Sequence, residues 1–341
     1  MTNQGRTTDR VISRPTLKTV AQLADLSVAT VSRALANDPK IAKSTRKRVN
    51  EFAASVGYIP DRAAQRLRTG KTKVISLILD PHQEILGFGN SLIIGLTNAL
   101  RGTDYHLNIT PHFLDDNASN PVEYIVRNQM ADGIIFSRTE PFDARVKYLL
   151  ERKFPFVSHG RTDLSQAHSY VDFDNQQFSE LAVNRLHEKG CKKLCILLPP
   201  DKFSFHQHLK YGFLKAVRNL GIEYYIPDNV HLDDPAENIG AWAKKLADAP
   251  DCPDGFVCPG ETSYLSILGG LRQAKQKTSA PEFVVKATTS LMQQIAPDID
   301  RIQEDICQAG QLLGQQLLAQ LEQPNSVVQQ HVFSPVADFN N

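Results

Sequence analysis

Residues 16–35, TLKTVAQLADLSVATVSRAL, predict two short helices separated by a tight turn. In the first helix, Val20, Leu23 and Ala24 fall on one face. Ser27 stands where its hydroxyl can cap a second helix over residues 28–35, by accepting from a free N–H group of the first turn. An apolar inner face and a polar, basic outer face are the pattern of a helix-turn-helix unit. The alternative for this stretch alone is an ordinary helical hairpin with a solvated outer face.

A third helix and a basic linker follow the first two helices. Ser44 is predicted to cap a helix over residues 45–55, whose first turns carry basic residues suited to phosphate contacts. Residues 60–70, PDRAAQRLRTG, predict a short helix that begins at Pro60 and ends at Gly70. Such a segment is too short to be stable alone, so it can act as a switch that is helical only when held. The alternative is a plain basic linker.

Charge is distributed unevenly along the chain. Residues 1–73 contain 15 Lys and Arg against 5 Asp and Glu, a balance of +10, although the whole chain carries only +1. A basic head on an acidic body predicts a polyanionic partner for the head alone. A disordered basic tail is the alternative, and the helical apolar periodicity of residues 17–56 argues against it. Disorder is therefore expected only for residues 1–15.

The composition argues against several classes of protein. The 341 residues, 41% hydrophobic and 22% charged, are typical of a globular chain with two or three domains. No apolar run could span a bilayer, and the polar N-terminus lacks the apolar core of a signal peptide, so we expect a cytoplasmic protein without a membrane partner. The 5 cysteines lack the spacing of a zinc site. We expect reduced thiols, no metal and no cofactor.

Residues 73–341 alternate between predicted strands and helices. Strands are expected at 74–79, 105–110, 133–136, 154–158, from 171, 193–198, near 230, 255–258 and 282–286, with helices between them and a last helix at 306–321. This alternation predicts doubly wound α/β sheets. The segment is too long for one such sheet, so we expect two lobes, with a ligand between them at the carboxyl ends of the strands.

Enzyme motifs are missing from the places where they would act. The turn after the first strand reads DPHQ, residues 80–83, instead of a glycine-rich phosphate loop, and the chain has no G-x-S-x-G elbow. We therefore expect no enzymatic activity. A periplasmic-type sugar-binding protein would share the two-lobed body, but it would carry a signal peptide and no basic head.

Taken together, these segments resemble the lactose-repressor (LacI/GalR) family of bacterial transcription regulators. The resemblance is carried by residues 16–35, by GYIP at 57–60, by AAQRL at 63–67, and more weakly by ADGIIFSRTEP at 131–141 and FVSHGR at 156–161. It implies a helix-turn-helix domain at 16–59, a hinge helix at 60–72, and two effector-binding and dimerising lobes of periplasmic-binding-protein type at 73–341. It further implies a cytoplasmic homodimer that represses by binding a palindromic operator, associates with the nucleoid when bound, and is released by a small molecule.

The resemblance also implies which residues contact DNA. In the head these are Thr19, Ser27, Val28, Ala29, Thr30, Ser32, Arg33 and Arg46, and Leu67 of the hinge would wedge into the central base step. Asp25 departs from the family pattern, which has Gly in the turn between the helices. Asp61 and Gln65 replace the usual Asn and Arg. We expect the turn and hinge to survive these changes, with an altered base preference.

A set of effector-binding positions is carried over in the same way, at strand ends facing the cleft. These are Phe88, Ser137, Arg138, His159, Arg161, Asp174, Phe205, His206, Glu261, Lys286 and Glu304. Charged side chains suit sugar hydroxyls, and aromatic rings suit the apolar face of a sugar. Other readings stay open: Arg161 with Asp174 as a structural ion pair, Phe205 as core, and His206 and His208 as solvated.

The effector class is the least determined part of the resemblance. The SRTEP and HGR runs are similar to those of glucoside- and disaccharide-responsive members, which favours a glucose-containing disaccharide or glucoside acting as inducer. The family's usual cleft arginine is replaced by Leu209. The alternative is a corepressor such as a purine or a phosphorylated sugar, because Arg161, Lys210 and Lys286 could meet an anion.

Overall fold

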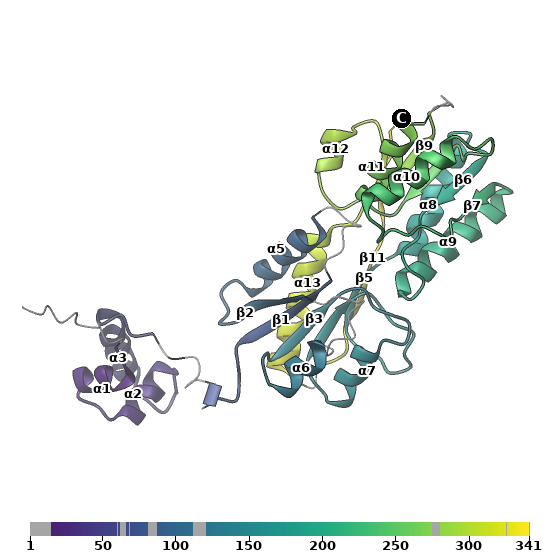
Figure 1. Ribbon diagram of the computed structural model, residues 1–341. Helices are drawn as coiled ribbons and strands as arrows, with labels where there is room; N and C mark the ends of the chain where they lie inside the picture. Colours follow the sequence, from purple (N-terminus) through teal and green to yellow (C-terminus); the bar gives the residue numbers. More distant parts are fainter. Residues whose placement is uncertain are drawn as a thin grey trace, which may run out of the picture. The chain divides into compact units, whose positions relative to one another are not determined.

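The computed structural model describes residues 15–59, 61, 66–67, 69–80, 87–111, 121–274, 280–324 and 326–340 (Figure 1). The chain divides into two compact units, Met1–Thr72 and Lys73–Asn341. Of the tail expected to be disordered, residues 1–15, all but the last residue lie outside the described residues, as do the hinge positions Pro60 and Gln65.

The first unit contains three helices around a small apolar core. They are α1 (Leu17–Ala24), α2 (Val28–Leu35) and α3 (Lys43–Ser55). Ser27 caps α2 as predicted, because its hydroxyl accepts from the backbone N–H of Thr30 at 3.1 Å. Two details of the prediction were wrong. Leu23 is 47% exposed, and α3 begins at Lys43 after Ala42, so Ser44 lies inside the helix and does not cap it.

The turn between α1 and α2 is made by a residue in the left-handed conformation. Asp25 ends α1 with φ 51° and ψ 50°. Its backbone N–H bonds the carbonyls of Ala21 and Gln22. Asp tolerates this region better than most side chains, although Gly adopts it without steric cost. The turn therefore survives the departure from the family pattern.

The second unit has two lobes, and the first is built on a six-stranded parallel sheet. Its strand order is β11-β5-β4-β3-β1-β2. The strands are β1 (Val74–Leu79), β2 (His106–Pro111), β3 (Gly133–Phe136), β4 (Phe156–His159), β5 (Tyr170–Phe173) and β11 (Gln330–Phe333). Its helices are α5 (Phe88–Leu100), α6 (Pro121–Arg127), α7 (Ala144–Glu151) and α13 (Ile306–Glu322).

The second lobe repeats this arrangement. Its order is β12-β10-β9-β8-β6-β7, parallel except for the antiparallel pair β10 and β12. The strands are β6 (Lys193–Ile196), β7 (Glu223–Tyr225), β8 (Gly255–Cys258), β9 (Glu282–Ala287), β10 (Asp300–Gln303) and β12 (Val336–Asp338). The helices are α8 (Asn175–Glu188), α9 (Ser204–Leu220), α10 (Ala236–Ala247), α11 (Glu261–Arg272) and α12 (Leu291–Ile295). Both lobes are doubly wound, which confirms the predicted fold class.

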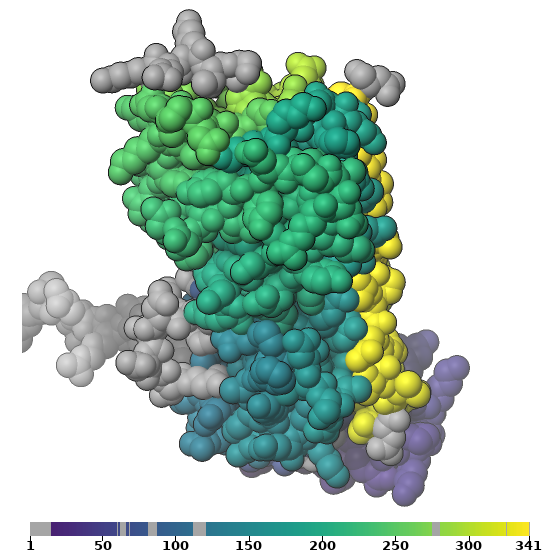
Figure 2. Space-filling model, turned by 90° about the vertical axis from the view of Figure 1, so that its right-hand side faces the viewer, coloured from purple at the N-terminus to yellow at the C-terminus, as the bar shows by residue number. Residues whose placement is uncertain are grey.

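The described chain passes between the lobes at three places: from β5 to α8, from β10 to α13, and from β11 to β12. Figure 2 shows the C-terminal residues, in yellow, extending along both lobes. The carboxyl ends of the parallel strands face the space between the lobes, where ligands of open α/β sheets bind.

One predicted strand is absent, and four strands, β7, β10, β11 and β12, were not predicted. The strand expected near residue 230 is absent from that segment, because Val230 and Leu232 are buried in a loop that follows β7. β10 was not predicted, because it contains Asp300 and Arg301. Both are buried with ion-pair partners, so this strand has no apolar signature.

Candidate functional site

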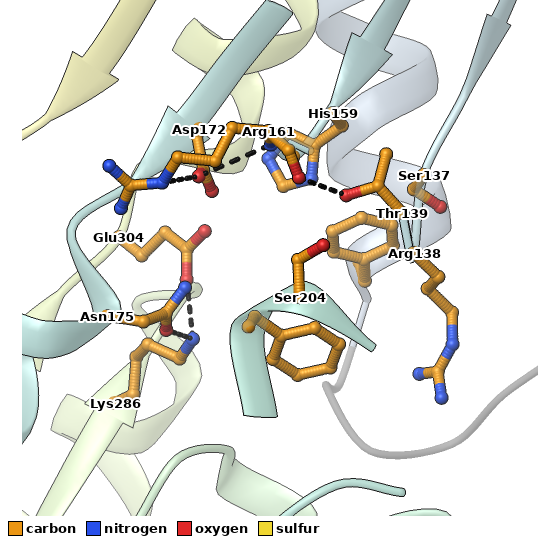
Figure 3. Close-up of a pocket in the computed structure, with 13 residues that line it drawn as sticks. Ser137, Arg138, Thr139, His159, Arg161, Asp172, Asn175, Ser204, Lys286 and Glu304 are labelled. Atoms are coloured by element: carbon orange, nitrogen blue, oxygen red, sulfur yellow. Dashed lines mark hydrogen bonds and ion pairs between the residues drawn. The ribbon is translucent and has the colours of Figure 1, made fainter. Parts of the chain in front are cut away.

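A pocket lies between the two lobes at the carboxyl ends of the strands (Figure 3). It encloses about 520 Å³ of empty space, including space open to solvent. Its lining residues come from the segments that follow β3 and β4, from β5, β9 and the segment after β10, and from the first turns of α5, α8 and α9. They are Phe88, Ser137, Arg138, Thr139, His159, Gly160, Arg161, Asp172, Asn175, Ser204, Phe205, Lys286 and Glu304.

Arg161 is one of the residues that line this pocket. Its Nε lies 2.8 Å from Oδ2 of Asp172. Figure 3 shows its two terminal nitrogens on the side away from Asp172, and neither has a hydrogen bond among the described residues. The alternative reading, in which Arg161 forms an ion pair with Asp174, is wrong, because the carboxylate beside Arg161 is that of Asp172. Asp174 instead caps α8, by accepting from the backbone N–H of Gln177 at 2.9 Å.

A buried ion pair forms another wall of the pocket. Lys286 Nζ lies 3.0 Å from Oε2 of Glu304 and donates to Oδ1 of Asn175 at 2.9 Å. The two charged side chains are only 4% and 6% exposed. Because a buried charge is costly without a partner, this pair requires both members. Its net charge is zero.

His159 and Ser204 are two of the uncharged polar residues that line the pocket. His159 packs edge-on against Phe88, with ring centroids 5.6 Å apart. Burial lowers the pKa of His159 despite the nearby carboxylates of Glu304 and Asp172, so the ring is neutral at physiological pH and offers one donor and one acceptor. Ser204 is 4% exposed, and its Oγ has no hydrogen-bond partner among the described residues. A buried hydroxyl left without a partner is costly, which favours a ligand group or a water at this point.

Arg138 lines the pocket, but its guanidinium is engaged elsewhere. It forms ion pairs with Asp80 and Asp233. Figure 3 shows this guanidinium on the opposite side from Asn175 and Lys286. Its charge is therefore compensated within the protein.

Besides Asp174, two other predicted residues, His206 and Glu261, do not line the pocket. The ring Nδ1 of His206 donates to the carbonyl of Pro199 at 2.6 Å, and the side chain is buried, not solvated. Glu261 is fully buried and accepts from the backbone N–H groups of Thr288 and Thr289. Both residues fix the local backbone. Sequence reasoning could not foresee these contacts, because their partners lie on other loops.

The residues that the sequence missed are neighbours of those that it named. Thr139 and Gly160 adjoin predicted residues in the chain, as does Ser204, while Asp172 and Asn175 flank the junction of β5 and α8. The end of a strand was a valid signal for the site. Which side chain at that end points inward depends on the exact residue at which the strand stops.

In the first unit, the outer face of α2 is accessible. Ser27, Val28, Ala29 and Arg33 are exposed, whereas Thr30 and Ser32 are half-buried. The hydroxyls of Ser27 and Thr30 lie 2.8 Å apart, so both serve the start of α2. The hydroxyl of Thr19 accepts from the backbone N–H of Thr16 at 3.1 Å, which completes a capping box at α1.

The two arginines named in this unit have partners inside it. Arg33 Nε donates to Asp38 Oδ2 at 2.9 Å. Arg46 donates to the backbone and side-chain oxygens of Asn37 at 3.1 and 3.0 Å, so it ties α3 to the segment after α2. Leu67 differs from both, because it is an apolar side chain that is 90% exposed.

Comparison with known proteins identifies the family. Residues 16–61 match the model of bacterial regulatory proteins of the lacI family. The HTH-type transcriptional regulator AglR of Rhizobium meliloti (strain 1021) is 30% identical over 270 residues, covering 76% of this chain and 73% of that protein. The chain belongs to the lacI family. RafR of Escherichia coli, another HTH-type transcriptional regulator, is 30% identical over 251 residues, covering 72% and 73%.

Solved structures of the family share the fold of this lacI-family chain. The lac repressor dimer bound to operator and the anti-inducer ONPF superimposes with a TM-score of 0.78 at 18% identity, covering 95% of this chain and 98% of that one. A complex of the transcriptional regulator CelR with cellobiose gives 0.67 at 21% identity, with the same coverage. The resemblance predicted from the sequence is confirmed: this chain is a transcriptional regulator with a helix-turn-helix DNA-binding domain.

The described residues of this regulator show neither a membrane span nor a metal site. None of the helices in the described ranges is long and apolar enough to cross a membrane. Within the same ranges, no group of three His, Cys, Asp or Glu side chains is placed to hold a metal ion.

Proposed function

We propose that this lacI-family regulator is a cytoplasmic repressor that binds a palindromic operator as a homodimer and is released by an uncharged carbohydrate. The observation that carries the effector class is the charge balance of the pocket. Each of the cations Arg138, Arg161 and Lys286 has a carboxylate partner within 3.3 Å. A phosphate or a nucleotide would need a cation that is not already neutralised. A ligand with hydroxyl groups needs only donors and acceptors.

The lining offers such donors and acceptors in several directions. The terminal nitrogens of Arg161 form a fork that can donate to two adjacent hydroxyls. Neutral His159 and the hydroxyl of Ser204 add groups that both donate and accept. Phe88 and Phe205 supply aromatic surface for the apolar face of a sugar ring. These features support a sugar. The SRTEP run, which supplies Ser137, and the HGR run, which supplies His159 and Arg161, support a glucose-containing disaccharide or glucoside.

The first unit supports operator binding in the manner of a helix-turn-helix protein. The exposed face of α2 would enter the major groove, with Ser27, Val28 and Arg33 toward the bases. Leu67 of the hinge is 90% exposed, and insertion into a base step would bury this apolar side chain. In the dimer, the lobes would pair side by side, and the 46% exposed Ile94 on α5 suits that contact.

The mechanism is a shift between two lobe arrangements. An effector that contacts both lobes favours the arrangement in which its contacts are complete. An effector with equal affinity for both arrangements would change nothing, however tightly it bound. Release of DNA on effector binding is the direction that we propose.

The effector class is tested by thermal unfolding of the full chain with added compounds. Cellobiose, maltose and raffinose represent neutral saccharides, and glucose 6-phosphate and guanine represent the alternative corepressors. A ligand that binds only the folded state raises the midpoint in proportion to the logarithm of its concentration. We expect a neutral saccharide to do so. Stabilisation by glucose 6-phosphate or guanine alone would contradict the proposal.

The DNA role is tested with Leu67→Ala and, as a matched control in the same segment, Arg66→Ala. Loss of a wedge should weaken binding to the operator far more than binding to non-specific DNA. Loss of a phosphate-contacting cation should weaken both and reduce the salt dependence. Equal losses on both duplexes for Leu67→Ala would refute the wedge.

A further inference from the structure

Arg138 lies at the boundary between the two lobes (the seam) and is paired with one carboxylate from each lobe. Its Nε is 3.3 Å from Oδ2 of Asp80, which follows β1 in the first lobe. Its Nη2 donates to Oδ2 of Asp233, which precedes α10 in the second lobe. The Arg138 side chain is 4% exposed, and its partners are 17% and 27% exposed. Because these pairs are shielded from water, the attraction across the seam is screened little.

The flat face of the same guanidinium contacts the second lobe as well. Its central carbon lies 4.2 Å from the ring centroid of Phe203 and 5.8 Å from that of Phe205. Phe203 is fully buried and immediately precedes α9. A planar cation can stack on an aromatic ring while its edge binds carboxylates, which an ammonium group cannot do as well.

The next residue in the chain continues this contact. The carbonyl of Thr139 accepts a hydrogen bond from the backbone N–H of Ser204 at 2.9 Å. Ser204 is the first residue of α9, so no carbonyl of that helix can serve its N–H. Two adjacent residues of the first lobe therefore hold the start of α9, which itself lines the pocket.

The backbone at Arg138 is built for this placement. Its φ is +57°, in the left-handed region that side chains other than Gly, Asn and Asp rarely adopt. The Arg145 guanidinium, which is paired with Asp143 at 2.6 Å, donates to the Arg138 carbonyl at 2.9 Å. Strained residues persist where their surroundings fix them, and they gather at binding and switch regions. Here the turn aims the side chain along the seam.

We infer that Arg138 is a positioning residue that clamps the start of α9 to the first lobe and so sets how firmly the pocket closes. The inference rests on the proposed role of the pocket, and it replaces the prediction that Arg138 binds effector directly. Arg138 acts through Phe203 and Ser204, whose position it fixes. Loosening the clamp would lower the population of the closed arrangement without removing any group that faces the ligand.

Hydrogen exchange of the full-length protein tests the clamp without an effector. The readout is the amide of Ser204, localised by mass spectrometry with electron-transfer fragmentation, because the one hydrogen bond that it makes to a described residue crosses the seam. Asp233→Asn removes the carboxylate charge from the second lobe. Hydrogen bonds to charged groups change equilibria on the order of tenfold or more. We expect exchange at Ser204 to accelerate by about tenfold.

The matched control is Asp251→Asn in the same lobe. Asp251 is 77% exposed and pairs with Lys193, so the same substitution breaks an ion pair that does not cross the seam. Exchange at Ser204 should stay unchanged in this control, and Asp233→Glu should remain close to wild type because the charge is kept. Equal exchange in Asp233→Asn and Asp251→Asn would overturn the clamp. An acceleration spread evenly over all strands of the unit would do the same.

A second experiment tests the clamp and the carbohydrate proposal independently of each other. Cellobiose, maltose and raffinose are titrated against wild type and Asp233→Asn, with thermal unfolding as readout. For a saccharide that stabilises wild type, the same stabilisation of the variant should require an about tenfold higher saccharide concentration. If Ser204 responds to Asp233→Asn while no saccharide binds wild type, the clamp stands and the carbohydrate proposal fails.

Discussion

Replacing Lys286 by Met should destabilise the second unit strongly. Lys286 and Glu304 are 4% and 6% exposed and lie 3.0 Å apart. The substitution removes the cation, leaves Glu304 buried beside His159, and also removes the donor to Asn175. Removing one partner of a buried ion pair costs about 3–5 kcal/mol, because the other charge is left uncompensated. Met keeps an unbranched aliphatic chain near Phe173. We therefore expect the free energy of unfolding to fall by about 3 kcal/mol, the lower end of this range.

The assay is thermal unfolding of the full chain, monitored by circular dichroism. For a unit of this size, about 3 kcal/mol corresponds to a midpoint lowered by roughly 6–12 °C. Lys215→Met is the matched control, since Lys215 is 44% exposed and pairs with Glu180 on the surface. We expect little change for this control.

The double variant Lys286→Met with Glu304→Gln decides whether the buried charge is the cause. Neutral replacements of both members of a buried pair are often tolerated, so the double variant should recover most of the lost stability. If it is as unstable as the sum of the two single variants, the loss comes from packing. That result would refute the electrostatic reasoning.

Three further predictions concern single positions. Asp25→Gly should stabilise the head by roughly 0.5–1 kcal/mol, because φ is 51° there, and urea unfolding of the full chain measures the gain. Gly212→Ala should cost several kcal/mol (order of magnitude), since its Cβ would lie 2.2 Å from the Gln176 carbonyl; the thermal midpoint should fall, and an unchanged midpoint would show that α8 and α9 can separate freely. His159→Gln should flatten the pH dependence of stability. Burial lowers the pKa of His159, so its contribution is present above the unfolded value near 6.5 and is lost as pH falls below it; denaturant unfolding at pH 7.5 and 5.5 checks this sign.

Local chemistry in the sequence was enough to predict much of the fold. The bounds of α2 follow from Ser27, whose cap is a contact between close neighbours in the chain. β1 is apolar except for Ser76, β8 has no polar side chain apart from a cysteine thiol, and the structure places both strands as expected. β10 could not be predicted, because the contacts that bury it come from residues far away in the sequence. Asp300 is buried against Arg185, 115 positions away, and no local pattern reveals such a partner.

The pocket could be predicted in location but less well in detail. Ends of parallel strands meet between the lobes, and Ser137, His159 and Lys286, which the family resemblance implied at such ends, do line the pocket. The direction of a side chain was harder. Arg138 follows β3 as expected, but its left-handed backbone turns the guanidinium into the seam. A positive φ at a residue other than Gly has no reliable sequence signal.

The most direct test of the account is one fluorescence-anisotropy titration of the full-length protein. A palindromic duplex with a central C-G step is compared with a scrambled duplex at two salt concentrations, and the titration is then repeated with cellobiose, maltose and raffinose. The account predicts tighter binding to the palindrome at both salts, lost on addition of one saccharide. Equal binding to both duplexes, with no change on adding any saccharide, would contradict it.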